Sequence, residues 1–427
     1  MGCRFLPELT GDELADRQLA GLQWTVAHCH ANSPFYRERF KEAGVEPGDI
    51  TSLDDLRRLP VTTADHLKDG YPLPLLAVDE SEVVRIHSSS GTTGKRKILA
   101  YTQNDVDLWK DMMARCYELA GCDRLDRVQI CVGYGLWTAG AGFQLGCERF
   151  GAMALPVGPG MLDIQIQLLT DLGATTLCST ASMALLMAEE VEKRGLRDNL
   201  RLKRGIFGAE THTPKMRARF EELLDLEHSF DIVGMTELYG PGTGLECQAH
   251  EGVHYWADRY ILEILDPDTL EPVEPGEIGE MVVTTLSKEA SPLVRYRTRD
   301  LTRLLPEPCP CGLSVPRHDK ILGRSDDMII VRGVNIYPGQ IAEILGGFPE
   351  LSSEYQVHLT RVTGKDFMTV SVERAPEAAS GGDEAMASAV AASMQRHLLV
   401  SAKVEIKDPG DLPRTFAKTK RVIDDRG

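Results

Sequence analysis

The sequence predicts an α/β protein with largely parallel sheets, followed by a β-rich part and a separate α+β segment. Three observations support this prediction. Between residues 127 and 237, short apolar segments alternate with helical segments, as expected when crossover helices join parallel strands. From residue 260 onward, strands separated by turns replace this alternation. After the break at residues 322–327, the chain contains a new set of strands and helices.

The composition is that of an ordinary globular protein. The chain has 427 residues, of which 42% are hydrophobic and 26% are charged, enough for roughly two or three domains. The net charge of −17 and the pI near 5.2 argue against nucleic acid or an anionic membrane as the main partner, because both attract basic surfaces. No signal segment and no run of ~18 apolar residues is found. We therefore expect a cytoplasmic protein, and its 10 cysteines fit reduced thiols.

The first hundred residues contain a helical segment and a short strand. Residues 10–44 repeat apolar side chains at helical spacing, and Gly44 is expected to cap the end. Residues 60–75 are rich in turns and lead to a strand at 82–87. A helix at 104–120 follows.

The strand, turn and helix order recurs through the middle of the chain. Ligands collect at the carboxyl ends of parallel strands, so the turns that follow these strands are candidate binding positions. The predicted strands cover residues 127–134, 152–158, 174–180, 204–210 and 228–237, and helices separate them. The C-terminal segment is predicted to contain a strand at 368–374, a helix at 385–399, a strand at 402–408 and a basic tail at 412–427.

Residues 87–97, HSSSGTTGKRK, combine hydroxyl groups, glycines and basic side chains directly after a predicted strand. Hydroxyls and closely approached backbone N–H groups suit a polyphosphate. The G-x-x-x-x-G-K-[ST] nucleotide loop is excluded, because Ser89 and Arg96 stand where it requires a glycine and a hydroxyl. A phosphate loop and a plain surface loop are the two interpretations.

Motifs spread over the chain resemble one known family. They are HSSSGTTGK, GYGLWTAGAGFQLGCERFGA, IFGAE, FDIVGMTE, YRTRDL, PCPCG, GRSDDMIIVRGVNIYPGQI and LPRTFAKTKRVID. In this order, from about residue 15 to the end, they resemble the phenylacetate–coenzyme A ligase family of the adenylate-forming enzymes. The resemblance implies an N-terminal AMP- and acyl-binding domain, residues 1–322, made of two sheet-and-helix halves and a β subdomain. Residues 323–427 would form a small, mobile α+β lobe.

The resemblance implies a ligase that uses ATP, Mg²⁺ and coenzyme A. ATP would activate an aryl carboxylic acid to an acyl-adenylate, which would then transfer its acyl group to the thiol of coenzyme A. One alternative is delivery to a carrier-protein phosphopantetheine or another nucleophile. A more distant alternative is a non-catalytic ligand-binding scaffold. The family resemblance also suggests a homodimer.

Three residues are implied to carry the adenylation chemistry, which needs cations and donors around the α-phosphate and the leaving pyrophosphate. Lys418 aligns with the adenylation lysine, although Phe416 and Ala417 replace the glutamate and glycine that precede it in the family. Glu237, beside Thr236, is the implied Mg²⁺ ligand. The alternatives are a solvated basic tail for Lys418 and a helix N-terminal acid for Glu237.

The resemblance assigns ATP binding to the loop and to positions further along the chain. Asp300 would accept hydrogen bonds from both ribose hydroxyls, the alternative being a surface ion pair with Arg297 or Arg299. Val233 stands where the family has a tyrosine that stacks on adenine. The implied ATP-binding residues are Ser88, Ser89, Ser90, Gly91, Thr92, Thr93, Gly94, Lys95, Glu210, Asp231, Asp300 and Arg324.

The implied acid pocket combines two aromatic side chains with small residues, which suits a planar aryl acid. Tyr134 and Trp137 are core aromatics in the alternative interpretation. Several family members have Phe at position 137, so Trp137 narrows the slot, and a benzoate or aminobenzoate competes with phenylacetate as the substrate. The implied pocket residues are Tyr134, Gly135, Trp137, Ala139, Gly140, Ala209, Gly234, Met235, Pro241 and Gly242.

Two further positions are assigned through the resemblance. Asp326 matches the hinge residue about which the C-terminal lobe would move, and Gly333 matches the turn that lines the approach of the coenzyme A thiol. An ordinary interdomain linker is the alternative for this junction.

Four residues indicate a structural zinc site apart from this chemistry. Cys247, His254, Cys309 and Cys311 fit a tetrahedral Cys₃His set. His250 is an alternative to His254, although His254 is the position that matches the family. Unpaired, reduced cysteines are the alternative to a metal site.

Overall fold

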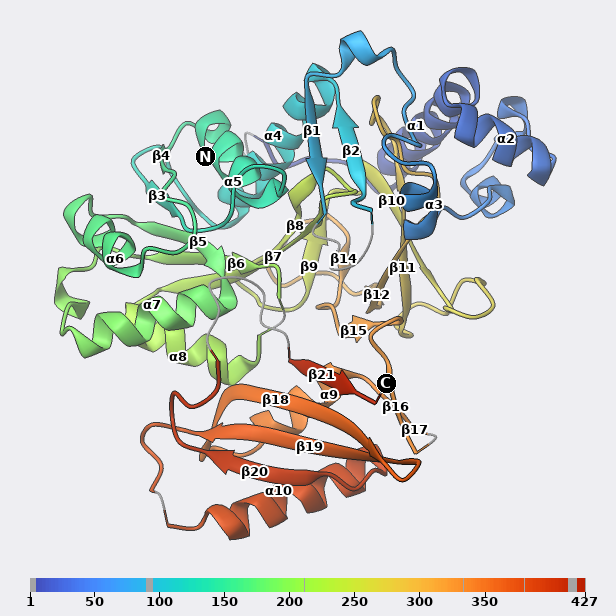
Figure 1. Ribbon diagram of the computed structural model, residues 1–427. Helices are drawn as coiled ribbons and strands as arrows, with labels where there is room; N and C mark the ends of the chain where they lie inside the picture. The colour runs from blue at the N-terminus through green and yellow to red at the C-terminus, as the bar shows by residue number, and fades with distance from the viewer. Residues whose placement is uncertain are drawn as a thin grey trace. The chain divides into compact units, whose positions relative to one another are not determined.

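The computed structural model describes residues 5–89, 95–210, 212–332, 334–379, 381–413 and 421–426. Two compact units make up the chain, and each is described by itself. The first unit contains Met1–Ser179, Arg201–Gly208 and His228–Ile321, and the second contains Thr180–Leu200, Ala209–Glu227 and Leu322–Gly427. The elements of both units are labelled in Figure 1.

Two helices replace the single helical segment expected at the N-terminus. Helix α1 (Gly11–Asn32) begins at Thr10, whose side chain accepts a hydrogen bond from the backbone of Glu13. Helix α2 (Pro34–Ala43) starts after Ser33, because a proline fits the first helical turn but disfavours helical backbone in the residue before it. Gly44 ends α2 in the left-handed conformation, as predicted, with φ of 65°.

A β-hairpin frames residues 89–97. Strand β1 (Arg85–Ser88) pairs with β2 (Ile98–Tyr101) in antiparallel fashion, with Ser88 opposite Ile98. Helix α4 (Gln103–Leu119) follows directly and is capped by the side chain of Thr102. The short elements before this hairpin are α3 (Ala64–Asp69) and the 3₁₀ helices η1 (Pro47–Asp49), η2 (Leu53–Arg58) and η3 (Glu80–Glu82).

A mixed sheet in the order β13-β14-β9-β8-β7-β6-β5-β3-β4 forms the centre of the first unit. The pairs β4/β3, β3/β5 and β6/β7 are parallel, while β7 to β9 and β14/β13 pair antiparallel. Helices α4 and α5 pack on it (Figure 1). The elements are β3 (Arg127–Ile130), α5 (Thr138–Phe150), β4 (Met153–Leu155), α6 (Leu162–Asp171), β5 (Thr176–Thr180), β6 (Arg204–Gly208), β7 (His228–Met235), β8 (Gly240–Glu246), β9 (Val253–Tyr255), β13 (Leu304–Leu305) and β14 (Arg317–His318).

A second, antiparallel sheet confirms the predicted change of pattern after residue 260. Its strands β10 (Tyr260–Leu265), β11 (Gly279–Thr285) and β12 (Tyr296–Thr302) pair in that order. The predicted α/β fold class is thus confirmed.

The second unit contains its own sheet in the order β20-β19-β18-β21. Its core includes Val357, Val370 and Met394, and α9 and α10 pack on its strands. The predicted basic tail includes strand β21, which pairs in parallel with β18 because its apolar residues continue the sheet. The elements are α7 (Ala181–Lys193), η4 (Arg197–Asn199), α8 (Pro214–Leu224), β15 (Gly323–Arg324), β16 (Ile329–Val331), β17 (Val334–Ile336), α9 (Pro338–Gly346), β18 (Leu351–Val362), β19 (Lys365–Arg374), α10 (Asp383–Leu398), β20 (Lys403–Lys407) and β21 (Val422–Asp425).

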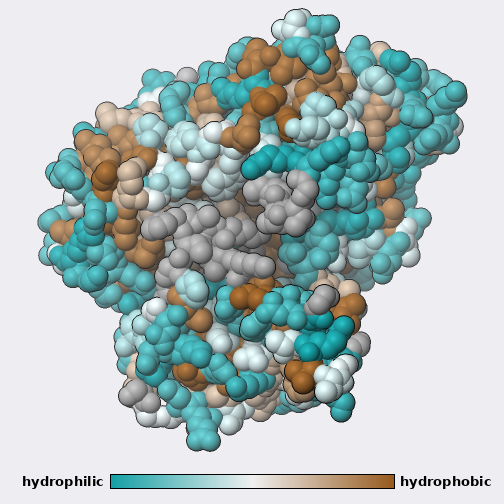
Figure 2. All heavy atoms as spheres, in the orientation of Figure 1, coloured by the Kyte–Doolittle hydropathy of each residue, from teal (hydrophilic) through white to brown (hydrophobic). Residues whose placement is uncertain are grey.

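The visible face of the molecule is largely hydrophilic (Figure 2). Apolar residues are scattered among the hydrophilic ones. Within the described ranges, each helix lacks either the length or the apolar character that a membrane crossing requires.

Gly44 and Gly48 offer a matched test of backbone strain, because an added Cβ has open space at both positions and only Gly44 has positive φ. We expect Gly44→Ala to lower the free energy of unfolding by about 1 kcal/mol, since left-handed backbone is costly for alanine. Gly48→Ala should change it by less than about 0.5 kcal/mol. Urea unfolding measures both, and equal losses would contradict the assigned cap.

Candidate active site

Thr236 and Glu237 lie in the turn formed by residues 236–239, which joins β7 to β8. Gly234 pairs with Pro241 at the base of this turn. A side chain at Gly234 would collide with the backbone of Gly240, so the hairpin requires glycine there. The alternative interpretation of Glu237 as a helix N-terminal acid is wrong, since no helix follows it in this turn.

The Glu237 carboxylate is nearly buried, with 5% of the residue exposed. Its Oε1 forms an ion pair with Lys97, at the end of the predicted phosphate loop. The Tyr296 hydroxyl donates a hydrogen bond to the same oxygen at 3.4 Å. A carboxylate that already binds one cation in a sheltered position fits the donor type that Mg²⁺ prefers.

Two side chains hold the carbonyl groups of this turn from inside the protein. The Tyr101 hydroxyl lies 2.9 Å from the carbonyl oxygens of both Thr236 and Tyr239. Lys288 Nζ donates to the carbonyl oxygen of Glu237 at 2.8 Å. The backbone that carries Glu237 is therefore fixed by residues of β2 and of the segment after β11.

Lys288 and Tyr101 were missed by sequence reasoning. Lys288 is fully buried, and burial lowers its pKa to about 8, against the opposing attraction of Asp105 and Glu237. No local motif marks either residue. The sequence shows only that Lys288 follows shortly after an apolar strand. A lysine at such a position is usually interpreted as part of a solvent-exposed turn.

Two serine hydroxyl groups at the start of the predicted phosphate loop have no hydrogen-bond partner among the described residues. The side-chain oxygens of Ser88 and Ser89 are buried and have no hydrogen-bond partner in the described structure. The Ser88 amide donates to the carbonyl oxygen of Leu136 at 2.8 Å, so this end of the loop contacts the bend that contains Tyr134. Buried hydroxyls without partners are costly, and phosphate oxygens would satisfy them.

Tyr134 and Trp137 are half-buried and pack against the core, each beside a glycine. A Cβ at Gly140 would lie 2.6 Å from the Tyr134 ring, and a Cβ at Gly133 would lie 2.8 Å from the Trp137 ring. The Tyr134 hydroxyl is buried and unpartnered, and burial raises its pKa. Both rings therefore pack closely against glycine positions of the same bend.

The predicted floor of the slot is packed against α4. Trp109 Nε1 donates to the carbonyl oxygen of Pro241 at 2.8 Å, and Trp256 Nε1 donates to that of Gly242 at 2.6 Å. The Thr138 hydroxyl, at the start of α5, lies 3.3 Å from that of Thr236. The structure thus brings the start of α5, where Ala139 is buried, next to the turn that bears Glu237.

The predicted nucleoside-binding residues lie on strands or just after them. Asp300 is on β12 and Asp231 is on β7, where its amide donates to Glu246 at 3.1 Å. Arg297 and Arg299 are the partners of Asp300 in the alternative interpretation. Both form ion pairs with Glu280, at 2.8 Å and 3.4 Å.

Four of the predicted residues that the structure describes belong to the second unit. Ala209 has positive φ of 68°, and the Glu210 carboxylate accepts a hydrogen bond from the amide of Ser182 at 2.6 Å. Arg324 donates to both oxygens of Asp326, at 2.9 Å and 3.0 Å. The predicted residues that lie outside the described structure are Ser90, Gly91, Thr92, Thr93, Gly94, Gly333 and Lys418.

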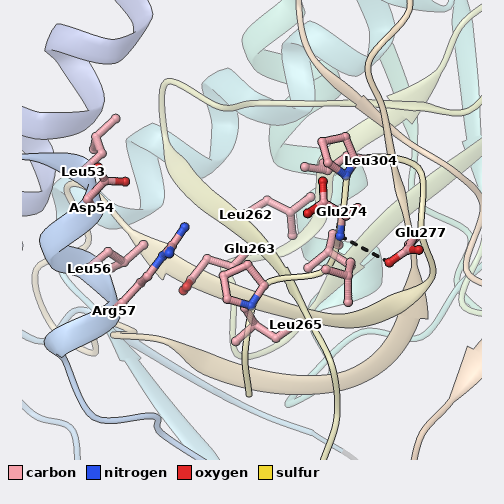
Figure 3. Close-up of a pocket in the computed structure, with 14 residues that line it drawn as sticks. Leu53, Asp54, Leu56, Arg57, Leu262, Glu263, Leu265, Glu274, Glu277 and Leu304 are labelled. Atoms are coloured by element: carbon pink, nitrogen blue, oxygen red, sulfur yellow. Dashed lines mark hydrogen bonds between the residues drawn. The ribbon is translucent and has the colours of Figure 1, made fainter. Parts of the chain in front are cut away.

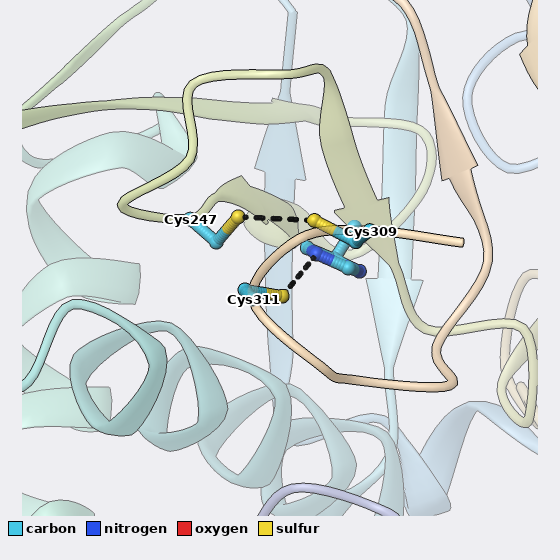
Figure 4. A group of neighbouring side chains, drawn as sticks. Cys247, Cys309 and Cys311 are labelled. Atoms are coloured by element: carbon cyan, nitrogen blue, oxygen red, sulfur yellow. Dashed lines mark hydrogen bonds between the residues drawn. The ribbon is translucent and has the colours of Figure 1, made fainter. Parts of the chain in front are cut away.

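The predicted zinc ligands come from two separate segments of the chain, and the labelled cysteines of both segments lie close together (Figure 4). The ligand atoms of Cys247, His254, Cys309 and Cys311 all lie within 4.8 Å of one another. Cys247 Sγ is 3.5 Å from Cys309 Sγ, and Cys311 Sγ is 3.3 Å from His254 Nε2. A tetrahedral ion fits a donor set of this type.

His254 is already oriented as a metal ligand. Its Nδ1 lies 2.8 Å from the carbonyl oxygen of Val315, which fixes the tautomer with the proton on Nδ1 and leaves Nε2 available. Burial lowers its pKa and keeps the ring neutral. His250, the alternative ligand, instead lies 3.2 Å from Glu246.

A separate surface pocket contains none of the predicted site residues (Figure 3). It has a volume of about 230 Å³ and lies between η2 and the β10/β11 sheet, where Leu53, Arg57 and Leu262 line it. None of the residues that line this pocket belongs to the predicted ATP, acid or zinc sites.

Comparison with known proteins gives concordant results. The model of the AMP-binding enzyme family matches residues 25–287, and that of the AMP-binding enzyme C-terminal domain matches residues 333–426. The chain is 41% identical to a phenylacetate-coenzyme A ligase of Pseudomonas putida, covering 97% of this chain and 95% of that protein. It is 38% identical to one of Thermus thermophilus, covering 98% of each.

A solved structure is also similar. A 2-hydroxyisobutyryl-CoA ligase in complex with its adenylate superposes with a TM-score of 0.90 at 29% identity. The match covers 98% of this chain and 91% of that chain.

Tyr101→Phe tests the support of the turn, because it removes the hydroxyl proton that the carbonyl groups of Thr236 and Tyr239 share. Tyr117→Phe is the matched control, since the buried Tyr117 hydroxyl donates to one carbonyl, that of Phe143. A buried carbonyl group that loses its donor costs about 1–3 kcal/mol, so Tyr101→Phe should lower the free energy of unfolding at least as much as Tyr117→Phe. Chemical denaturation provides the comparison, and a smaller loss for Tyr101→Phe would contradict the support described here.

Proposed function

The chain belongs to the phenylacetate–coenzyme A ligase family of AMP-forming acid–thiol ligases, and from this premise we propose that an aryl carboxylic acid is its substrate. ATP activates the acid to an acyl-adenylate, and coenzyme A receives the acyl group. The observation that carries the proposal is the buried Glu237 carboxylate, which contacts the end of the phosphate loop through Lys97. Sequence similarity over 97% of the chain supports it.

Negative charge develops on the α-phosphate and on the leaving pyrophosphate during adenylation, and each proposed residue would stabilise part of that charge. The acid's carboxylate attacks the α-phosphorus, pyrophosphate leaves, and the thiol later displaces AMP from the adenylate. The loop beginning at Ser88 would hold the pyrophosphate, and Lys418 would approach the α-phosphate. Glu237 would hold Mg²⁺, which supplies neutralising charge to the phosphates.

The acid is proposed to lie between the bend at Tyr134 and the hairpin base at Gly234. Phenylacetate is the first candidate, since it names the activity of the similar ligases. Trp137 has a larger ring than Phe, so the shorter benzoate or an aminobenzoate is the competing candidate. The unpartnered Tyr134 hydroxyl gives this slot a polar group within an otherwise apolar wall.

We also propose that residues 1–322 carry the AMP- and acyl-binding parts and that residues 323–427 form a lobe that moves about Asp326. The separate family model over residues 333–426 supports this division. Gly333 would line the approach of coenzyme A, and the enzyme would act as a cytoplasmic homodimer. The free thiols of the nine described cysteines are consistent with a reducing compartment.

A structural zinc ion is proposed at Cys247, His254, Cys309 and Cys311. The hydrogen bond from His254 Nδ1 to Val315 supports it, because this is the usual arrangement of a metal-bound imidazole. The ion would be closed off by its four ligands and would take no part in the reaction.

ATP–pyrophosphate exchange driven by a panel of aryl acids tests the proposed function. We expect exchange with phenylacetate or a benzoate, and Lys418→Ala should reduce it by about 10²-fold or more. Lys420→Ala, which removes a lysine two positions along, is the matched control and should retain most of the activity. Absence of exchange with every acid would refute the proposed enzyme.

Consumption of the free thiol of coenzyme A, followed by thiol titration, identifies the acceptor. We expect coenzyme A to consume the adenylate with loss of one titratable thiol per acyl group transferred. Adenylate that persists with coenzyme A but reacts with a carrier-protein phosphopantetheine would establish the alternative acceptor.

Metal analysis tests the zinc site. We expect about one zinc per chain, lost on Cys309→Ser together with several degrees of thermal stability. Cys122→Ser, a thiol outside the cluster, should keep the metal. Metal-free wild-type protein of unchanged stability would contradict the proposal.

A further inference from the structure

Lys288 occupies the inner side of the turn that carries Glu237. The residue is fully buried, and its Nζ donates to the Glu237 carbonyl oxygen at 2.8 Å. Nζ also lies 4.9 Å from the centre of the Tyr101 ring and 5.0 Å from that of the Tyr239 ring. A buried ammonium is costly unless hydrogen bonds and opposite charges compensate it, so its surroundings must supply both.

Asp105 supplies one opposite charge and also positions the lysine. Its carboxylate is buried and accepts hydrogen bonds from the amides of Glu289 at 2.7 Å and Ala290 at 3.0 Å. These are the two residues that follow Lys288. The carboxylate of α4 therefore anchors the backbone next to Lys288, while the ammonium is directed at Glu237.

Glu237 lies between two lysines that differ in exposure. Lys97 contacts its carboxylate and has 20% of its side chain exposed, whereas Lys288 contacts its backbone and is fully buried. The partly exposed Lys97 ammonium can exchange its carboxylate partner for a phosphate, which would leave the Glu237 carboxylate available to a metal ion. A buried group whose donor is engaged with the backbone can act on the ligand only through Glu237.

We propose that Lys288 is a positioning residue for adenylation, which holds the backbone of Glu237 so that its carboxylate is directed at the magnesium–nucleotide complex. The proposal rests on the proposed function, since the magnesium ligand is part of it. It adds a role for a residue outside every motif of the sequence.

The alternative is that Lys288 only stabilises the fold. Thr25 provides the matched control, because its buried hydroxyl donates to the carbonyl oxygen of Thr285 at 2.8 Å, at the end of β11. Thr25→Val removes a buried donor to a carbonyl near Lys288 in the sequence, without touching the turn at residues 236–239.

The test compares ATP binding by calorimetry with and without Mg²⁺, in wild type, Lys288→Met and Thr25→Val. In Lys288→Met we expect the Mg²⁺-dependent gain in ATP affinity to fall about tenfold, the effect of losing one charge-assisted hydrogen bond. ATP binding without Mg²⁺ should change by less than about threefold. Thr25→Val should lose thermal stability and keep the Mg²⁺ effect.

The half-reactions provide a second readout. Lys288→Met should slow acyl-adenylate formation, while thioester formation from supplied acyl-adenylate and coenzyme A stays within about twofold of wild type. If Lys288→Met does not fold, Lys288→Gln, which keeps a donor without the charge, replaces it and must lower the Mg²⁺ effect by a smaller factor, since a neutral hydrogen bond is weaker than a charge-assisted one.

A folded Lys288 variant whose Mg²⁺-dependent gain in ATP affinity is unchanged or larger would overturn the proposal. A Lys288 variant that slows both half-reactions equally would also overturn it. So would a Thr25→Val variant that loses as much of the Mg²⁺ effect as the Lys288 variant. Failure of the proposed function itself is distinguishable. In that case the wild-type protein would show no Mg²⁺-dependent ATP binding and no adenylate formation.

Discussion

The carbonyl groups of the hairpin turn at residues 236–239 need hydrogen-bond donors from the interior of the protein. Side chains from separate segments of the first unit supply these donors. The carbonyl groups of Thr236, Glu237 and Tyr239 receive donors from Tyr101 and Lys288. Tyr101 belongs to the strand after the phosphate loop, and Lys288 follows a strand of the other sheet. One turn therefore links three parts of the chain, and its orientation depends on all of them.

The same contacts connect the parts of the proposed site. The predicted phosphate loop contacts the bend at Leu136 through the amide of Ser88, and contacts Glu237 through Lys97 at its other end. Movement of either anchor would change the spacing between the proposed acid slot and the pyrophosphate position. Precise spacing of reacting groups is a large part of what such an enzyme contributes.

Local patterns were sufficient to predict the α/β fold class, the Gly44 cap and a site shared by the cysteines, whereas the choice of His254 over His250 came from the family resemblance. Each depends on residue types whose roles are recognisable in sequence: alternating apolar strands and helices, a glycine after a helix, and a C-P-C pair with distant partners. The break between α1 and α2 at Ser33 results from Pro34, which disfavours helical backbone in the residue before it. The sequence contained this signal, but the single predicted helical segment did not take it into account.

Contacts between distant segments could not be predicted in this way. The Lys97–Glu237 pair joins residues on two different hairpins, and Lys288 reaches the turn across a sheet boundary. A lysine in a sequence is normally expected in solvent, so its burial was visible only once Asp105 and two tyrosine rings surrounded it. The positions of Lys97, Glu237 and Lys288 therefore depend on opposite charges that meet in the folded structure, and not on local secondary-structure propensity.

The Cys₃His cluster has a consequence for the unfolded chain. Cys247 and Cys309 are 62 residues apart in sequence, and the segment between them contains β10, β11 and β12. A metal ion held by both ends would close this loop and reduce the conformational entropy of the unfolded state, as a disulfide does. Unlike a disulfide, such a cross-link persists in a reducing environment and is reversed by chelation.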